Sequence, residues 1–162
     1  MNKKIIFILE DQKTLSDQLE PNIREGLKNS LFEEELFESC VCSTISDAKD
    51  NFEEYKDRIA CVICDANMVS IGLSPELIEL SNYGLHSGWL WLCDTIENGN
   101  AWLAGRSIIY SAYRNELTRF IKNNSVYKKY ESIPIVEKKS ISSSESSELV
   151  KNIIKILKKD AK

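Results

Sequence analysis

The chain has 162 residues, of which 43% are hydrophobic, and a formal net charge of -4 at pH 7. This length suits a single domain, residues 1–162, with a well-formed core, and it is short for two domains. The acidic balance argues against direct nucleic-acid binding, because nucleic-acid-binding domains concentrate basic residues on one surface.

No stretch approaches the roughly 20 apolar residues that a membrane span needs, so we expect no membrane association. The amino terminus has a short apolar run after two lysines, but no small-residue cleavage site of a signal peptide follows it. We therefore expect a cytoplasmic protein.

Four short apolar runs predict strands, and each run ends at polar residues. The runs lie within residues 5–11, 61–65, 108–112 and 133–138, and they end at Glu10-Asp11, Asp65, Ser111 and Lys138 respectively. Uninterrupted apolar runs of this length are typical of strands buried on both faces, as in a parallel sheet covered by helices. In such sheets ligands bind beyond the carboxyl ends of the strands, where all these polar groups fall.

Amphipathic helical patterns alternate with these runs. The predicted helices cover 14–28, a stretch containing Ala48, Phe52 and Tyr55, 75–81, 85–98, 115–122 and the segment after a capping box at Ser142 and Glu145, with a weaker strand at 35–43. Pro21 predicts a kink or a restart of the first helix, because proline removes a backbone donor. The alternation of strands and helices predicts an α/β fold, a doubly wound five-stranded parallel sheet with helices on both faces.

We interpret the cysteine, tryptophan and histidine residues as parts of the core or the surface rather than of a metal site. Cys61 and Cys64 have the spacing of metal ligands, but residues three apart on a strand point to opposite faces and would not bind one ion. We expect buried reduced thiols at all five cysteines, which are Cys40, Cys42, Cys61, Cys64 and Cys93. Trp91 and Trp102 do not belong to the apolar face of the helix predicted at 85–98, and they either pack within the chain or meet another chain. His86, the single histidine, is expected at a helix surface or an interface.

The strand-end carboxylates predict a metal site. Glu10 and Asp11 are adjacent and free to direct oxygen atoms at one divalent cation beside Asp65. Mg²⁺ favours such a site, with carboxylates, a backbone carbonyl and water or phosphate oxygens as ligands. We expect the carbonyl of Asn67 to complete the protein ligands.

The same edge of the sheet carries groups that suit phosphoryl transfer to Asp65. Lys138 supplies a positive charge for phosphoryl oxygens, and the Ser111 hydroxyl can donate a hydrogen bond to another. Phosphoryl transfer depends mainly on positioning and charge neutralisation, and a carboxylate nucleophile is already ionised at neutral pH. If Lys139 entered the site in place of Lys138, the strand register would shift by one residue.

The ordered set resembles the receiver domain of bacterial two-component response regulators. The matching positions are Leu9-Glu10-Asp11, Asp65, Met68, Gly88, Ser111-Ala112 and Lys138. The resemblance implies a flavodoxin-like (CheY-like) fold, Mg²⁺, and a phosphoryl group received on Asp65 from a histidine kinase or a phosphotransfer protein. It also implies a downstream protein target and a movement of Ser111 toward the phosphate, and it leaves a homodimer open.

Three departures from the family pattern favour an alternative function. Lys139 stands where the family usually has proline, Ile135 stands where it often has an aromatic residue, and an insertion is expected at about 69–84. The alternative is a pseudo-receiver that binds proteins without phosphorylation. A phosphohydrolase of the haloacid dehalogenase type fits less well, because it needs its nucleophile on the first strand and a second aspartate where Asn67 stands. We therefore expect a signalling module rather than an enzyme.

Overall fold

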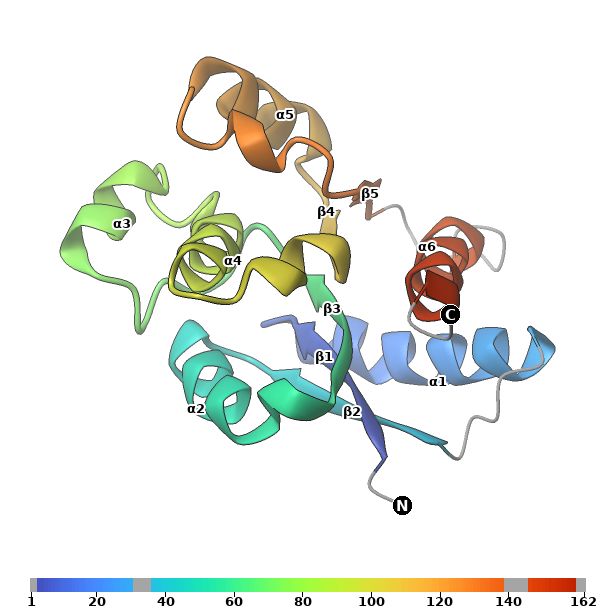
Figure 1. Cartoon of the computed structure of the whole chain (residues 1–162). Coiled ribbons are helices and arrows are strands. Elements are labelled where there is room, and N and C mark those ends of the chain that lie inside the picture. Colours follow the sequence, from blue (N-terminus) through green and yellow to red (C-terminus); the bar gives the residue numbers. More distant parts are fainter. Residues whose placement is uncertain (1–2, 31–35, 139–145, 160–162) are drawn as a thin grey trace.

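The computed structural model of the chain describes residues 3–30, 36–138 and 146–159. Its centre is a sheet of five parallel strands in the order β2-β1-β3-β4-β5 (Figure 1). The strands are β1 (Lys4–Leu9), β2 (Phe37–Cys42), β3 (Ile59–Cys64), β4 (Ser107–Ser111) and β5 (Ile135–Glu137). This order, 2-1-3-4-5, is that of the flavodoxin-like fold, and it confirms the predicted fold class.

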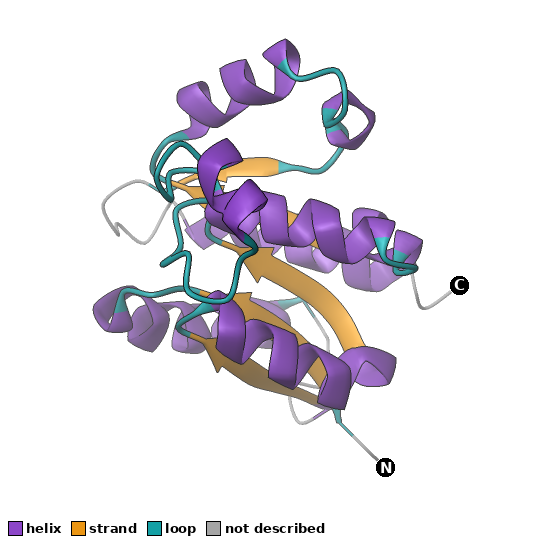
Figure 2. Ribbon diagram, turned by 90° about the vertical axis from the view of Figure 1, so that its left-hand side faces the viewer, coloured by secondary structure: helices purple, strands orange, loops and turns teal. Residues whose placement is uncertain are grey.

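Helices cover both faces of the sheet (Figure 2). They are α1 (Lys13–Asn29), α2 (Ile45–Tyr55), α3 (Pro75–Leu80), α4 (Ser87–Glu97), α5 (Arg114–Asn123) and α6 (Ser146–Lys159), with short 3-10 turns at Lys56–Arg58, Ala101–Gly105 and Lys128–Tyr130. The apolar residues of α1 and α6 pack on one face of the sheet, and those of α2, α4 and α5 pack on the other. The predicted capping box at residues 142–145 lies outside the described residues.

Strand β1 shows why these sequences form a buried sheet. Ile6 and Ile8 face the layer of α1 and α6, whereas Phe7 and Leu9 face the layer of α2, α4 and α5. Alternate side chains of a strand point to opposite faces, so a strand covered on both sides needs an uninterrupted apolar run. The same alternation places Cys61 and Cys64 in different layers, as predicted.

Trp91 packs in the core, which agrees with the intramolecular alternative. Its side chain is 1% exposed, and its ring centroid lies 6.3 Å from those of Phe7 and Phe52. Trp102 is 36% exposed and stacks on Phe52. A single apolar stripe fails to describe α4, because residues 87–93 are all buried.

Helix α1 passes through Pro21 without interruption, so the restart that we allowed for does not occur. Pro21 and Asp17 are both exposed. The carbonyl of Asp17 is the one that loses its helical donor at Pro21, and on the outer side of the helix water can replace that donor. The exposed position therefore allows the helix to continue through the proline.

The segment between β3 and α4 contains the short helix predicted after Ser74. The Ser74 hydroxyl accepts a hydrogen bond from the Leu77 amide at 3.4 Å, and Pro75 occupies the first turn of α3. The organisation as one domain with an insertion at about 69–84 stays a prediction. None of the described helices is long and apolar enough to cross a membrane.

Candidate functional site

Three carboxylates meet at the carboxyl ends of β1 and β3. These strands are neighbours, and the Asp65 amide donates to the Leu9 carbonyl at 3.0 Å. On the other side of β1, the Glu10 amide donates to the Cys42 carbonyl at the end of β2, also at 3.0 Å. One oxygen atom each of Glu10, Asp11 and Asp65 lies within 4.8 Å of the others. Glu10 and Asp65 are only 2% and 4% exposed and Asp11 is half-buried, so two buried carboxylates and one half-buried carboxylate form an acidic group at the predicted edge of the sheet.

Lys138 reaches into this acidic group from the end of β5. Its Nζ lies 2.6 Å from Glu10 Oε2 and 2.6 Å from Asp65 Oδ2. The Lys138 amide donates to the Ser111 carbonyl at 2.9 Å, which continues the pairing of β4 with β5. Lys138 is therefore the lysine that enters the site; Lys139 lies outside the described residues.

Burial and charge act in opposite directions on these groups. Burial raises the pKa of Glu10 and of Asp65, although the nearby Lys138 lowers both. The two carboxylates raise the pKa of Lys138, although burial opposes them. The effect of burial on the pKa of the two carboxyls therefore outweighs the effect of the Lys138 ammonium.

The remaining oxygens of these carboxylates accept backbone hydrogen bonds. Glu10 Oε1 accepts from the Gln12 amide and Asp65 Oδ1 from the Asn67 amide, each at 3.1 Å. Such bonds fix the orientation of both side chains before any ligand binds. The hydrogen bond holds the Asn67 amide against the Asp65 carboxylate. The use of the Asn67 carbonyl as a metal ligand stays a prediction.

Ser111 ends β4, the neighbour of β3, and is completely buried. Its Oγ accepts a hydrogen bond from the Tyr113 amide at 3.1 Å. The hydroxyl is thus held at the start of the connection from β4 to α5. Its predicted role toward a phosphoryl group stays a prediction.

Gly88 permits a close approach between α4 and Asp65. A Cβ atom on Gly88 would lie 1.9 Å from the backbone oxygen of Asp65, and the Gly88 amide donates to the Ala66 carbonyl at 2.9 Å. The preceding Ser87 accepts from the Met68 amide at 3.1 Å through its Oγ, which also contacts the Met68 carbonyl. The amino end of α4 therefore holds the loop that follows Asp65.

Two contributors to this site were missed in the sequence. Ser87 has no motif of its own, although it adjoins the glycine that the family resemblance singled out. The Tyr110 ring centroid lies 5.7 Å from Lys138 Nζ. An aromatic ring attracts an ammonium group at this distance and so restricts the lysine further. In the sequence, the position of Tyr110 next to Ser111 is the feature that connects it with the site.

His86 is buried, so its expected place on a helix surface was wrong. It is 4% exposed, and its ring centroid lies 4.3 Å from that of Phe120. Among the described residues, its Nδ1 has no hydrogen-bond partner. The apolar side of α5 covers the start of α4, and the helical pattern of α4 alone gave no sign of that cover.

The burial of His86 predicts a loss of stability on acidification. Burial lowers its pKa below 6.5. The unfolded chain then binds a proton at a higher pH than the folded one, so this contribution to stability declines as the pH falls below 6.5. Urea unfolding of wild type and His86→Phe, compared between about pH 8 and about pH 5, measures it. We expect the stability of wild type to fall relative to the variant; parallel pH profiles would contradict the prediction.

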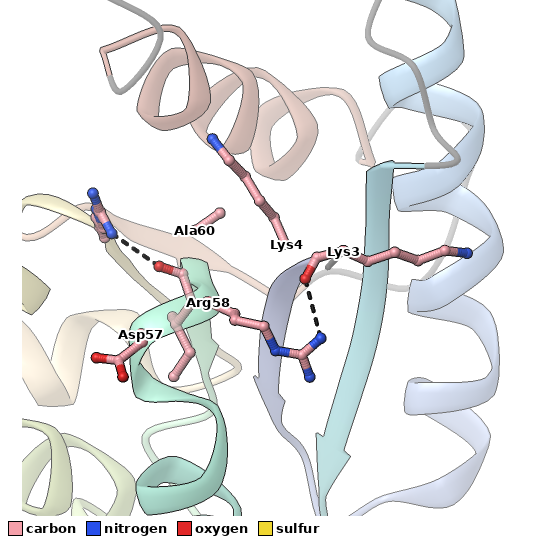
Figure 3. A pocket seen from close by; sticks show the side chains of 7 residues that line it. Lys3, Lys4, Asp57, Arg58 and Ala60 are labelled. Atoms are coloured by element: carbon pink, nitrogen blue, oxygen red, sulfur yellow. Dashed lines mark hydrogen bonds between the residues drawn. The ribbon is translucent and has the colours of Figure 1, made fainter. Parts of the chain in front are cut away.

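The opposite edge of the sheet is basic. Lys3, Lys4, Arg58 and Arg106 line a cavity of about 270 Å³ together with Asp57, Ile59 and Ala60 (Figure 3). Arg58 donates to the Lys3 carbonyl at 3.3 Å, and Arg106 to the Ile59 carbonyl at 3.0 Å. In Figure 3 the ammonium groups of Lys3 and Lys4 point in different directions. The chain thus separates an acidic group at one edge of the sheet from basic residues at the other.

No protein-family model and no curated protein matches the sequence. Solved structures do match the fold. A response regulator receiver domain protein from Clostridium thermocellum is 14% identical with a TM-score of 0.59, covering 98% of this chain and 97% of that one. A CheY-like receiver domain protein from Methanospirillum hungatei JF-1 is 14% identical with a TM-score of 0.58, covering 98% and 99%.

A third structure is the two-component transcriptional regulator AraC from Clostridium phytofermentans ISDg. It is 18% identical with a TM-score of 0.56, and the match covers 98% of each chain. The three likenesses extend over nearly all of this chain. The chain therefore has the fold of CheY-like response regulator receiver domains.

Proposed function

We propose that the chain is a receiver module that accepts a phosphoryl group on Asp65 and passes on a signal through protein contacts or phosphorelay. One observation carries this proposal. The buried Asp65 carboxylate shares the end of the central strands with two further carboxylates within 4.8 Å and with the Lys138 ammonium at 2.6 Å. An acceptor carboxylate, acidic ligands and a cation are the groups that such a transfer requires.

The donor set fits Mg²⁺. Glu10, Asp11 and Asp65 offer only oxygen atoms, and the Asn67 carbonyl would add another; hard cations of this size prefer such ligands. When bound, the ion would offset the repulsion between Asp65 and the incoming phosphoryl group. Lys138 would then pair with phosphoryl oxygens, and the Ser111 hydroxyl would donate to another of them.

The proposal implies particular partners. A histidine kinase or a phosphotransfer protein would supply the phosphoryl group, and a downstream protein would recognise the modified surface. A second copy of this chain, forming a homodimer, is a further partner that the proposal allows. Asp65 follows the third strand rather than the first, which supports a receiver over a phosphohydrolase of the haloacid dehalogenase type.

A second candidate is an interaction module that works without phosphorylation. The observation in its favour is the position of Lys138, which already bridges Glu10 and Asp65 at 2.6 Å each. An ammonium group between two carboxylates supplies part of the charge that a metal would otherwise bring. A phosphoryl donor must displace that contact, whereas a protein partner that binds elsewhere need not.

Acetyl phosphate with millimolar Mg²⁺ distinguishes the two candidates. We expect an intact-mass gain of one phosphoryl group in wild type and none in Asp65→Asn, because the amide of the variant is no nucleophile. The gain should disappear when Mg²⁺ is chelated. Beryllofluoride should change the tryptophan fluorescence of wild type and leave that of Asp65→Asn unchanged. Trp91 can report on the site because it contacts Phe7, which lies on the strand that leads to Glu10.

Asp17→Asn is the matched control, because Asp17 is an exposed aspartate of α1. It should gain mass as wild type does. A folded wild-type protein that gains no mass and shows no response to beryllofluoride would refute phosphorylation and leave the interaction module. An equal gain in Asp65→Asn would place the acceptor on another residue.

A further inference from the structure

The basic edge of the sheet contains a cavity with a mostly cationic wall. It lies where β1 and β3 begin, at the opposite end of these strands from the acidic group. Its volume is about 270 Å³, and the charged residues described in its wall are Lys3, Lys4, Arg58, Arg106 and one carboxylate, Asp57 (Figure 3). The whole chain has a net charge of -4. These cations therefore create a local positive potential on an acidic protein.

Backbone contacts hold the two arginines in place. Arg58 Nη1 donates to the Lys3 carbonyl at 3.3 Å, and Arg106 Nη1 donates to the Ile59 carbonyl at 3.0 Å. The Arg106 guanidinium also lies 5.2 Å from the centroid of the Trp102 ring. A planar guanidinium matches the oxygen atoms of a phosphate group, and a carbonyl orients it without removing its charge. Two oriented cations therefore border the cavity before any ligand binds.

The positive charge of this cavity is only partly compensated. Arg58 pairs with Glu38 at 3.0 Å, but both side chains are partly exposed, and exposed ion pairs contribute little to stability. The Lys3 and Lys4 side chains are exposed, and neither ammonium group has a carboxylate partner within residues 3–30, 36–138 and 146–159. Lysine side chains are flexible, so both ammonium groups can turn toward an anion in the cavity. Four cations are thus opposed by the carboxylates of Asp57 and Glu38 alone among the residues named here.

We propose that this cavity binds a small anion that contains phosphate, such as pyrophosphate or a phosphate monoester. A phosphate monoester carries about two negative charges at neutral pH, whereas a single carboxylate carries one. The cavity is slightly smaller than the range of about 300 to 1,000 Å³ that is usual for ligand pockets, so it suits a compact anion. The net charge of -4 opposes a long polyanion such as nucleic acid. Binding at this edge does not require Asp65, which lies at the other end of β3.

Trp102 gives such binding an optical signal. A second cavity, of about 360 Å³, shares Asp57 and Arg106 with the first and has Trp102 in its wall. Trp102 is 36% exposed, whereas the other two tryptophans, Trp89 and Trp91, are buried. An anion that attracts the Arg106 guanidinium changes the charge beside the Trp102 ring. Pyrophosphate should therefore change the tryptophan fluorescence of wild type, and Trp102→Phe should bind it without that change.

Titration calorimetry with pyrophosphate tests the site. The buffer contains no divalent cation, which keeps the acidic group from binding a metal complex of the probe, and its ionic strength is held constant. We expect saturable binding of one pyrophosphate per chain, and weaker binding at higher salt, because salt screens the attraction. Acetate carries a single charge and should bind at least about ten-fold more weakly.

Single substitutions locate the bound anion. Arg58→Gln should weaken pyrophosphate binding about ten-fold or more, because a hydrogen bond between charged groups is lost. Lys4→Gln changes an exposed side chain, so it keeps the fold and should weaken binding about two- to five-fold. Lys13→Gln is the matched control, because Lys13 is an exposed lysine that begins α1 beyond the opposite end of β1. It should bind as wild type does, and so should Asp65→Asn.

Three results would overturn the proposal. The first is a folded wild-type protein that binds no pyrophosphate, or binds acetate equally well. The second is unchanged binding in both Arg58→Gln and Lys4→Gln. The third is a loss of binding in Asp65→Asn, which would place the anion at the acidic edge of the sheet.

Discussion

Gly88→Ala is expected to destabilise the protein by about 3 kcal/mol or more. The new Cβ would lie 1.9 Å from the backbone oxygen of Asp65 and 3.1 Å from Cys64 Sγ. Backbone atoms of a central strand cannot move aside as a flexible side chain does, so α4 or the end of β3 must shift. Urea unfolding followed by circular dichroism measures the loss, and the melting temperature should fall by about 6 to 12 °C.

Gly105→Ala is the matched control for this substitution. A Cβ at Gly105 would meet no atom within 4 Å, and its backbone does not require glycine. Replacement of such a glycine reduces the freedom of the unfolded chain, so stability should stay level or rise slightly. Equal stability of the Gly88 and Gly105 variants would show that α4 and Asp65 are not in close contact.

Lys138→Met is expected to lower the free energy of unfolding by about 3 to 5 kcal/mol at neutral pH. The side chains of Glu10 and Asp65 are 1% and 4% exposed, and each lies 2.6 Å from the Lys138 ammonium. Removal of the ammonium leaves two buried carboxylates near each other without their cation. Their pKa values, already raised by burial, should rise further.

The pH dependence of this loss tests its cause. Protonated carboxyls need no counter-charge, so the difference between wild type and Lys138→Met should shrink as the pH falls through the raised pKa values of Glu10 and Asp65. Urea midpoints across the acidic range measure it. Lys56→Met, which removes an exposed helical ion pair with Glu53, should leave the midpoint unchanged. A Lys138→Met loss that is constant with pH would indicate lost packing instead.

The strands and their polar ends were predictable from the sequence. A strand covered on both faces needs an uninterrupted apolar run, and the runs before Glu10 and Asp65 have that form. Parallel strands bring their carboxyl ends to one edge, so the chain order of Glu10, Asp65 and Lys138 was enough to place them together. The apolar runs predict the strands, and the parallel order of these strands brings their polar ends together.

Features that depend on packing between elements were not predictable in this way. His86 is buried because α5 covers it, and Trp91 of α4 is buried because it packs between Phe7 of β1 and Phe52 of α2. A helical pattern describes one helix and does not specify how many neighbours surround it. The contact between Gly88 and Asp65 likewise joins residues 23 positions apart in sequence, and only the fold brings them together.

Groups of opposite charge lie at the two ends of the central strands. Carboxylates gather where β1 and β3 end, and Lys3, Lys4, Arg58 and Arg106 gather where these strands and β4 begin. A local group of charges attracts an oppositely charged surface before contact. A partner with a positively charged face would therefore be drawn to the Asp65 edge, and salt would slow such encounters by screening the attraction.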